Sequence, residues 1–144
     1  MAACGVEDRN LKSATIFSSH EALVLDYERG LLRLADDPED PAAQQVLYNL
    51  SAHFLWVGER TRQLDGAHLD FVSRIRNPIG MKVSDKADPD ELLRIIDLLD
   101  PHREPGRLTF IHRMGAAAVA DKLPPLLDAM RRDGRRVLWV CDPM

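Results

Sequence analysis

The chain is 144 residues long and carries 19 Lys plus Arg against 23 Asp plus Glu, which gives a net charge of −4. This mildly acidic balance argues against a protein that neutralises a nucleic-acid backbone, and the length suits a single domain. Apolar residues make up 45% and charged residues 29% of the chain, a composition typical of folded domains that argues against disorder.

Membrane insertion, export and disulfide formation are also not expected. The apolar runs, such as Val137–Cys141, fall far short of the roughly 20 residues that span a bilayer. The first residues show no basic segment followed by an apolar one, so we predict a soluble, cytoplasmic protein. Cys4 and Cys141 lie at opposite ends without CxxC spacing, which predicts two reduced thiols.

The first third of the chain is expected to be helical. Ser18-x-x-Glu21 is a capping-box pattern that predicts a helix to about Leu34, with Ala22, Leu23, Tyr27, Leu31 and Leu34 on its apolar side. An acidic turn follows, and Pro41 is expected to begin a short helix that ends at Asn49. Residues 1–53 are therefore interpreted as a helical extension, and residues 54–144 as the main unit.

Four short apolar segments in the main unit have the composition of buried β-strands. They are Phe54–Val57, Ile79–Val83, Leu108–Ile111 and Val137–Cys141, and their first residues are 25, 29 and 29 positions apart. This period suits one strand, one loop and one helix per repeat, which predicts parallel strands joined by helical crossovers.

The segments between the strands carry helix signals. Asp88-Pro89-Asp90-Glu91 predicts a helix start, with Asp88 as the cap, Pro89 at the first position and an end before Pro101. A second helix is expected from Thr61 or Asp65 to just before Asn77-Pro78, and a third from Pro124 to Arg132, closed by Asp133-Gly134.

Cations follow three successive strands. Arg60 comes after the first, Lys82 lies near the end of the second, and Arg113 follows the third. Because ligands of parallel α/β proteins bind at the carboxyl ends of the strands, these side chains predict a site for a phosphorylated or carboxylated molecule. Taken alone, the Glu59-Arg60 pair is more simply interpreted as a solvated surface pair. An anion site is favoured only because three successive strands each carry a cation at the same end.

Other candidate residues carry weaker signals. The five histidines lack HExxH or i, i+4 pairing, so a metal cluster within the chain is not expected. Since His112 and Arg113 are adjacent in a strand, one of them must face away from the site. Trp56 suits either a pocket wall or the core. The basic run Arg131, Arg132, Arg135 and Arg136 reads as a solvated face near a helix end.

Six motifs together resemble the type II 3-deoxy-D-arabino-heptulosonate 7-phosphate (DAHP) synthases over nearly the whole chain. They are Ser19–Arg29, Gly58–His68, Asn77–Lys82, Pro105–Thr109, Arg113-Met114-Gly115 and Cys141–Met144. The resemblance implies a (β/α)8 barrel with extra helices, of which residues 54–144 would supply about half, with four parallel strands. It also implies the first step of the shikimate route to aromatic compounds, the condensation of phosphoenolpyruvate with erythrose 4-phosphate.

The resemblance assigns phosphoenolpyruvate binding to Glu59, Arg60, Lys82 and Arg113. Arg60 and Arg113 would grip the phosphate or carboxylate, Lys82 would neutralise the ligand and is the candidate proton donor, and Glu59 would orient the cations or a water. The resemblance also implies that the intact enzyme uses a divalent metal such as Mn or Co and that it is a homo-oligomer.

The match also departs from the family at the metal. The family's metal-binding histidine follows the motif that ends here at Met144, its other ligands have no counterpart in this chain, and Cys4 does not match the metal-binding cysteine. We therefore expect a fragment that is inactive alone and, with half a barrel, prone to associate through open strand edges. The alternatives are a non-catalytic subunit that binds a phosphorylated metabolite or serves assembly and, less favoured without a Gly-rich loop, a nucleotide-binding domain.

Overall fold

The computed structural model describes residues 15–37 and 45–143, and its central feature is a parallel sheet of five strands in the order β1-β4-β5-β6-β7. The strands are β1 (Ser19–Glu21), β4 (Phe54–Val57), β5 (Ile79–Ser84), β6 (Leu108–Arg113) and β7 (Leu138–Cys141). The four strands predicted from the apolar runs are confirmed, with β1 added at one edge. The parallel α/β class is confirmed as well, as an open sheet and not a closed barrel.

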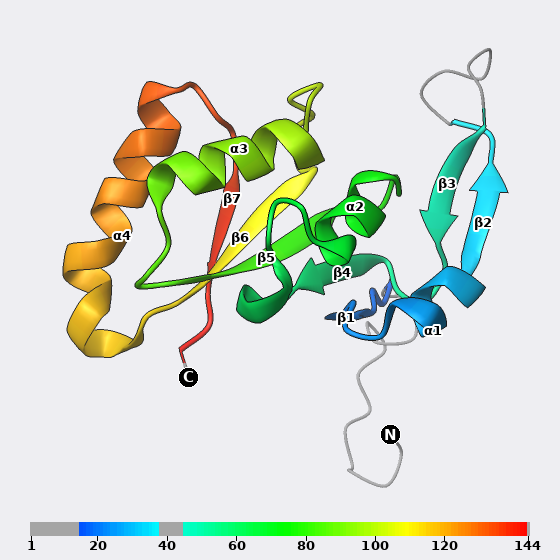
Figure 1. Ribbon diagram of the computed structural model, residues 1–144, viewed down its shortest axis with the longest axis horizontal. Helices are drawn as coiled ribbons and strands as arrows, with labels where there is room; N and C mark the ends of the chain where they lie inside the picture. The colour runs from blue at the N-terminus through cyan, green and yellow to red at the C-terminus, as the bar shows by residue number, and fades with distance from the viewer. Residues whose placement is uncertain (1–14, 38–44, 144) are drawn as a thin grey trace, which may run out of the picture.

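Three helices follow one another along one side of this sheet (Figure 1): α2 (Ala67–Ser73), α3 (Pro89–Leu99) and α4 (Gly115–Arg132). The strand residues that face them are in register, since Val57 pairs with Met81 and Met81 with Phe110. All three side chains are fully buried, and Phe110 also meets the edge of Trp139 at a ring distance of 5.1 Å. The hydrophobic core therefore lies between the sheet and the helices.

The opposite face of the sheet carries the alternate residues, among them Trp56 and Lys82. Gly80 lies on this face beside Trp56, where a Cβ atom would come within 2.6 Å of the Phe54 ring and 2.9 Å of Trp56 Cβ. The absence of a side chain at Gly80 is what lets these two aromatic residues pack across β4 and β5.

The helix starting at Asp88 is confirmed. The Asp88 side chain accepts a hydrogen bond from the backbone N–H of Glu91 at 3.0 Å, and Pro89 is the first helical residue. The predicted end of α4 is also confirmed, because Asp133 caps it and Gly134 follows with φ = +69°.

The predicted start of α4 at Pro124 is wrong by nine residues, since the helix begins at Gly115 and contains both Pro124 and Pro125. The alanine-rich stretch before the prolines has high helix propensity, and this outweighs the backbone hydrogen bonds lost at the prolines. The helix expected from Thr61 or Asp65 is shorter than predicted: Glu59–Thr61 forms a single 3-10 turn, η3, and α2 ends at Ser73.

The helical prediction for residues 18–34 is wrong. Ser19–Glu21 forms β1, whose backbone pairs with β4, and only Leu25–Gly30 is helical, as α1. The strands β2 (Leu32–Ala35) and β3 (Val46–Asn49) then form a separate antiparallel pair that lies beside the main sheet (Figure 1). The helix expected from Pro41 to Asn49 is therefore wrong over β3, while residues 41–44 lie outside the described residues. The division at residue 53 stays a prediction.

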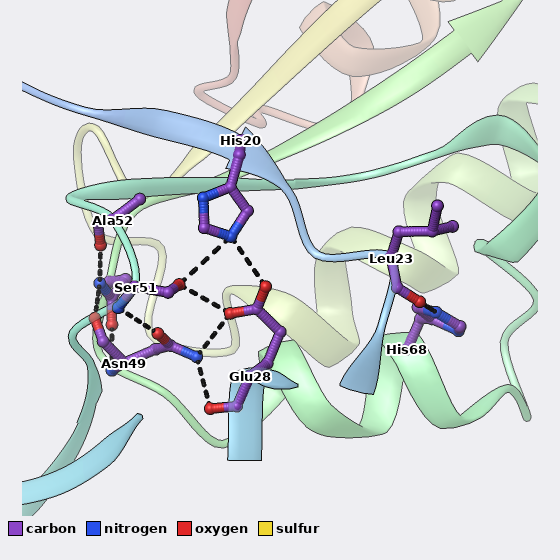
Figure 2. Close-up of polar contacts among 8 residues, drawn as sticks. His20, Leu23, Glu28, Asn49, Ser51, Ala52 and His68 are labelled. Atoms are coloured by element: carbon purple, nitrogen blue, oxygen red, sulfur yellow. Dashed lines mark hydrogen bonds and ion pairs between the residues drawn. The ribbon is translucent and has the colours of Figure 1, made fainter. Parts of the chain in front are cut away.

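A buried polar cluster holds this first region together (Figure 2). Glu28, on α1, is 1% exposed, and its side chain accepts hydrogen bonds from Ser51 Oγ at 2.6 Å and Asn49 Nδ2 at 3.0 Å. Its other oxygen lies 2.7 Å from Nε2 of His20 on β1. Asn77, ahead of β5, extends the cluster by accepting from the Asn49 backbone N–H at 2.8 Å. The cluster therefore ties α1 and β3 to the edge of the sheet.

Among the helices of the described residues, none combines the length and the apolar character needed to cross a membrane.

Candidate functional site

A cavity of about 480 Å³ opens at the carboxyl ends of β4, β5 and β6. The structure brings all four predicted site residues, Glu59, Arg60, Lys82 and Arg113, to its walls. They meet because each follows or ends a parallel strand, and parallel strands end at the same edge of a sheet. The remaining polar lining includes Glu21, Thr61 and Ser84.

Arg60 and Arg113 present exposed guanidinium groups to this cavity. Arg60 lies in the η3 turn after β4, and Arg113 is the last residue of β6. Within residues 15–37 and 45–143, neither guanidinium makes an ion pair or a side-chain hydrogen bond. Two planar guanidinium groups that line one cavity and have no partner among the described residues suit the bidentate recognition of phosphate or carboxylate.

Lys82 is half-buried and already has a protein partner. Its ammonium group forms an ion pair with the Asp142 carboxylate and lies 6.0 Å from the centre of the Trp56 ring. The backbone N–H of Asp142 donates to the carbonyl oxygen of His112 at 2.9 Å, which holds the chain after β7 against β6. Asp142 therefore fixes the lysine at the cavity wall without needing a ligand.

Glu59 is held by three donors from the chain itself. Its Oε1 accepts from Arg62 Nη2 and from Ser84 Oγ, both at 2.9 Å, and its Oε2 accepts from the Ser84 backbone N–H at 2.9 Å. Arg62 also donates to Glu91 Oε2 at 2.7 Å. Glu91, which the capping-box pattern assigned to the start of α3, thus turns its carboxylate toward Arg62.

His112 and Arg113 do face opposite ways. His112 is buried on the helix side of β6, whereas Arg113 lines the cavity. Trp56 is half-buried below the ammonium group of Lys82. The expectation that one of the two adjacent residues turns away from the site is therefore met, as the alternation of side chains along a strand requires.

Sequence reasoning missed several residues that shape the site, notably Glu21, Arg62 and Asp142. Glu21 reaches the cavity only because β1 joins the sheet, where its Oε1 would lie 2.3 Å from a Cβ atom at Gly58. Arg62 and Asp142 act through partners 29 and 60 positions away in the sequence. The short-range pattern gave no signal for these pairings.

The described residues include no group of three or more His, Cys, Asp or Glu side chains placed to hold a metal ion. The charged residues that line the cavity are the cations Arg60, Lys82 and Arg113, which are not metal ligands, and the two carboxylates Glu21 and Glu59.

The fold and the cavity together define a parallel α/β unit with a cavity at its strand ends, lined by the cations Arg60, Lys82 and Arg113. The chain belongs to the class-II DAHP synthetase family, whose sequence model matches residues 1–144. The resemblance inferred from the motifs is thereby confirmed.

Three curated relatives match along the whole chain. Phospho-2-dehydro-3-deoxyheptonate aldolase AroG of Mycolicibacterium smegmatis is 54% identical, and the Phospho-2-dehydro-3-deoxyheptonate aldolase of Streptomyces coelicolor is 51% identical. The probable chloroplastic enzyme of the same name from Catharanthus roseus is 49% identical. The chain spans 31%, 31% and 28% of these relatives, so it corresponds to less than a third of their length.

Proposed function

We propose that this chain forms the phosphoenolpyruvate-binding wall of a DAHP synthase, which condenses phosphoenolpyruvate, erythrose 4-phosphate and water to DAHP and phosphate. The observation that supports the proposal most directly is the convergence of Arg60, Lys82 and Arg113 on one cavity. Phosphoenolpyruvate carries a phosphate and a carboxylate on a three-carbon unit, and two guanidinium forks with an ammonium group match both anions.

Each residue has a distinct part in this proposal. Arg60 and Arg113 hold the two anionic groups, so that the reacting carbon is presented to the aldehyde in a fixed orientation. Lys82 adds a compact positive charge and is the candidate proton donor. Glu59 orients the wall of the cavity through its hydrogen bonds.

The proposal extends to the whole protein of which such a wall would be part. There the parallel sheet would be half of a (β/α)8 barrel, and the assembly would be homo-oligomeric with a divalent metal such as Mn or Co. Support for the barrel comes from β1 and β7, each of which is paired on one side only among residues 15–37 and 45–143. The cytoplasmic location stays a prediction, since the Catharanthus roseus relative is named as chloroplastic.

A chimera tests the proposal. In it, this chain replaces the matching segment of the Mycolicibacterium smegmatis relative, which aligns over all 144 residues. We expect DAHP synthase turnover from the chimera and weak, salt-sensitive phosphoenolpyruvate binding by the chain alone. A folded chimera that binds phosphoenolpyruvate without turnover would instead support a non-catalytic binding module.

Arg113→Ala in the chimera tests the assignment of the ligand. Loss of a charge-assisted contact to the anion should weaken phosphoenolpyruvate binding by about 30- to 100-fold, with a much smaller effect on erythrose 4-phosphate. Arg136→Ala, an exposed arginine that does not line the cavity, is the matched control. Equal losses for both substrates would contradict the assigned role.

A further inference from the structure

Arg62 is a buried arginine beside the cavity at the carboxyl ends of β4, β5 and β6, which is called the anion cavity below. It links the wall of this cavity to α3. Its side chain is 8% exposed, with Nη2 at 2.9 Å from Glu59 Oε1 and Nη1 at 2.7 Å from Glu91 Oε2. Two carboxylates from different elements thus converge on a single guanidinium. A buried charge is tolerated where its partners compensate for the lost hydration.

Arg62 remains a cation in this position. Burial disfavours the charged form, but the hydrogen bonds that it donates to Glu59 and Glu91 outweigh burial and raise the pKa of Arg62 above its ordinary value. The side chain next to Glu59 is therefore positively charged at neutral pH.

The carboxylate of Glu59 is turned toward the protein. Arg62 and Ser84 together supply three hydrogen bonds to its two oxygens. A carboxylate with this many donors already has most of its acceptor sites occupied. Its contribution to the cavity is therefore its charge and its fixed position, and that charge would repel an anionic ligand unless it were compensated.

The charge balance of the lining depends on this compensation. The lining carboxylates are Glu21 and Glu59, and the lining cations are Arg60, Lys82 and Arg113. Asp142 already balances the charge of Lys82. With Glu59 uncompensated, the two carboxylates would offset the guanidinium groups of Arg60 and Arg113, and the cavity would lose its preference for anions.

We propose that Arg62 is a positioning residue of the anion cavity, which neutralises and holds Glu59 and so keeps the lining net positive for a doubly acidic ligand. This inference rests on the proposed function, because it concerns the same cavity and the same ligand. Arg62 does not line the cavity and acts only through Glu59.

The test measures phosphoenolpyruvate affinity in the full chain and in the chimera. Arg62→Gln exposes the ligand to an uncompensated charge and should weaken binding about tenfold. Adding Glu59→Gln removes that charge and should recover part of the affinity that Arg62→Gln loses. A double variant that binds as weakly as Arg62→Gln, or more weakly, would overturn the inference.

Two further variants separate charge from folding. Glu91→Gln breaks the other contact of Arg62 and should lower the unfolding midpoint with little change in affinity. Arg62→Lys keeps a cation and should therefore retain phosphoenolpyruvate affinity. This variant tests the inference even if Arg62→Gln does not fold. A tenfold loss of affinity in Arg62→Lys would contradict the inference. If the unsubstituted chain and chimera both fail to bind phosphoenolpyruvate, the proposed function fails, whereas binding that is insensitive to Arg62→Gln refutes only the inference.

Discussion

Replacing Glu28 by alanine should destabilise the protein strongly, because its carboxylate is the centre of the buried cluster in Figure 2. A hydrogen bond to a charged acceptor contributes about 1.5–3 kcal/mol. Two donors keep a second partner: Asn49 Nδ2 still reaches the Glu28 carbonyl oxygen at 3.0 Å, and Ser51 Oγ lies 3.3 Å from His20 Nε2. The expected loss is therefore below the full sum, at about 3–5 kcal/mol, as for other broken buried pairs.

Urea denaturation followed by tryptophan fluorescence measures this loss. With a slope of about 2 kcal/mol per molar urea, the midpoint for Glu28→Ala should fall by about 2 M, a large part of the stability of a small domain. Glu28→Gln should cost less, because its amide oxygen still accepts a hydrogen bond. Asp26→Ala, on the same helix but 94% exposed, should leave the midpoint unchanged. A loss below about 1 kcal/mol for Glu28→Ala would refute the argument that the cluster is a stabilising unit.

Three further predictions concern packing, a half-buried cation and an exposed carboxylate. Gly80→Ala should lower the free energy of unfolding by about 1–3 kcal/mol through overpacking, whereas Gly30→Ala, which meets nothing within 4 Å, should be tolerated; equal effects in calorimetry would count against the close approach at Gly80. Arg107→Met should cost about 2–4 kcal/mol, because the guanidinium donates to three backbone carbonyls that would lose their partner; an unchanged thermal midpoint would disprove this role. The hydrogen bond donated by Arg74 lowers the pKa of Asp70 below its ordinary value of 3.8. The stability that this bond confers is therefore present above that pH and lost as the pH falls through the pKa of Asp70 in the folded state. In an NMR titration, Arg74→Ala should raise the pKa of Asp70, and an unchanged titration would argue against the pair.

The apolar periodicity predicted the repeating part of the fold well, for a local reason. Strands β4 to β7 and helix α3 each carry their own signal, in β-branched runs for the strands and in the Asp88-Pro89 start for α3. The four predicted site residues follow from the same pattern, because a parallel sheet gathers the ends of its strands at one edge.

The first region shows where that reasoning stops. A helix from Ser18 to Leu34 would have buried Tyr27 and Leu34, yet these side chains are 58% and 64% exposed, and Glu28 is buried instead. The backbone of β1 finds hydrogen-bond partners in β4, more than 30 positions away, and this pairing overrides the local helix signal.

The α/β repeat, the family and the three cations that line the cavity could be read from the chain before folding, because each is written in short-range patterns and motifs. The carboxylates that accompany those cations became visible only in the folded molecule. The pairs Lys82–Asp142 and Arg62–Glu91 join residues from separate elements, and the carboxylate of Glu28 is held by Ser51, 23 positions further along the chain. Contacts of this kind depend on how the elements pack together, which no local pattern of residues encodes.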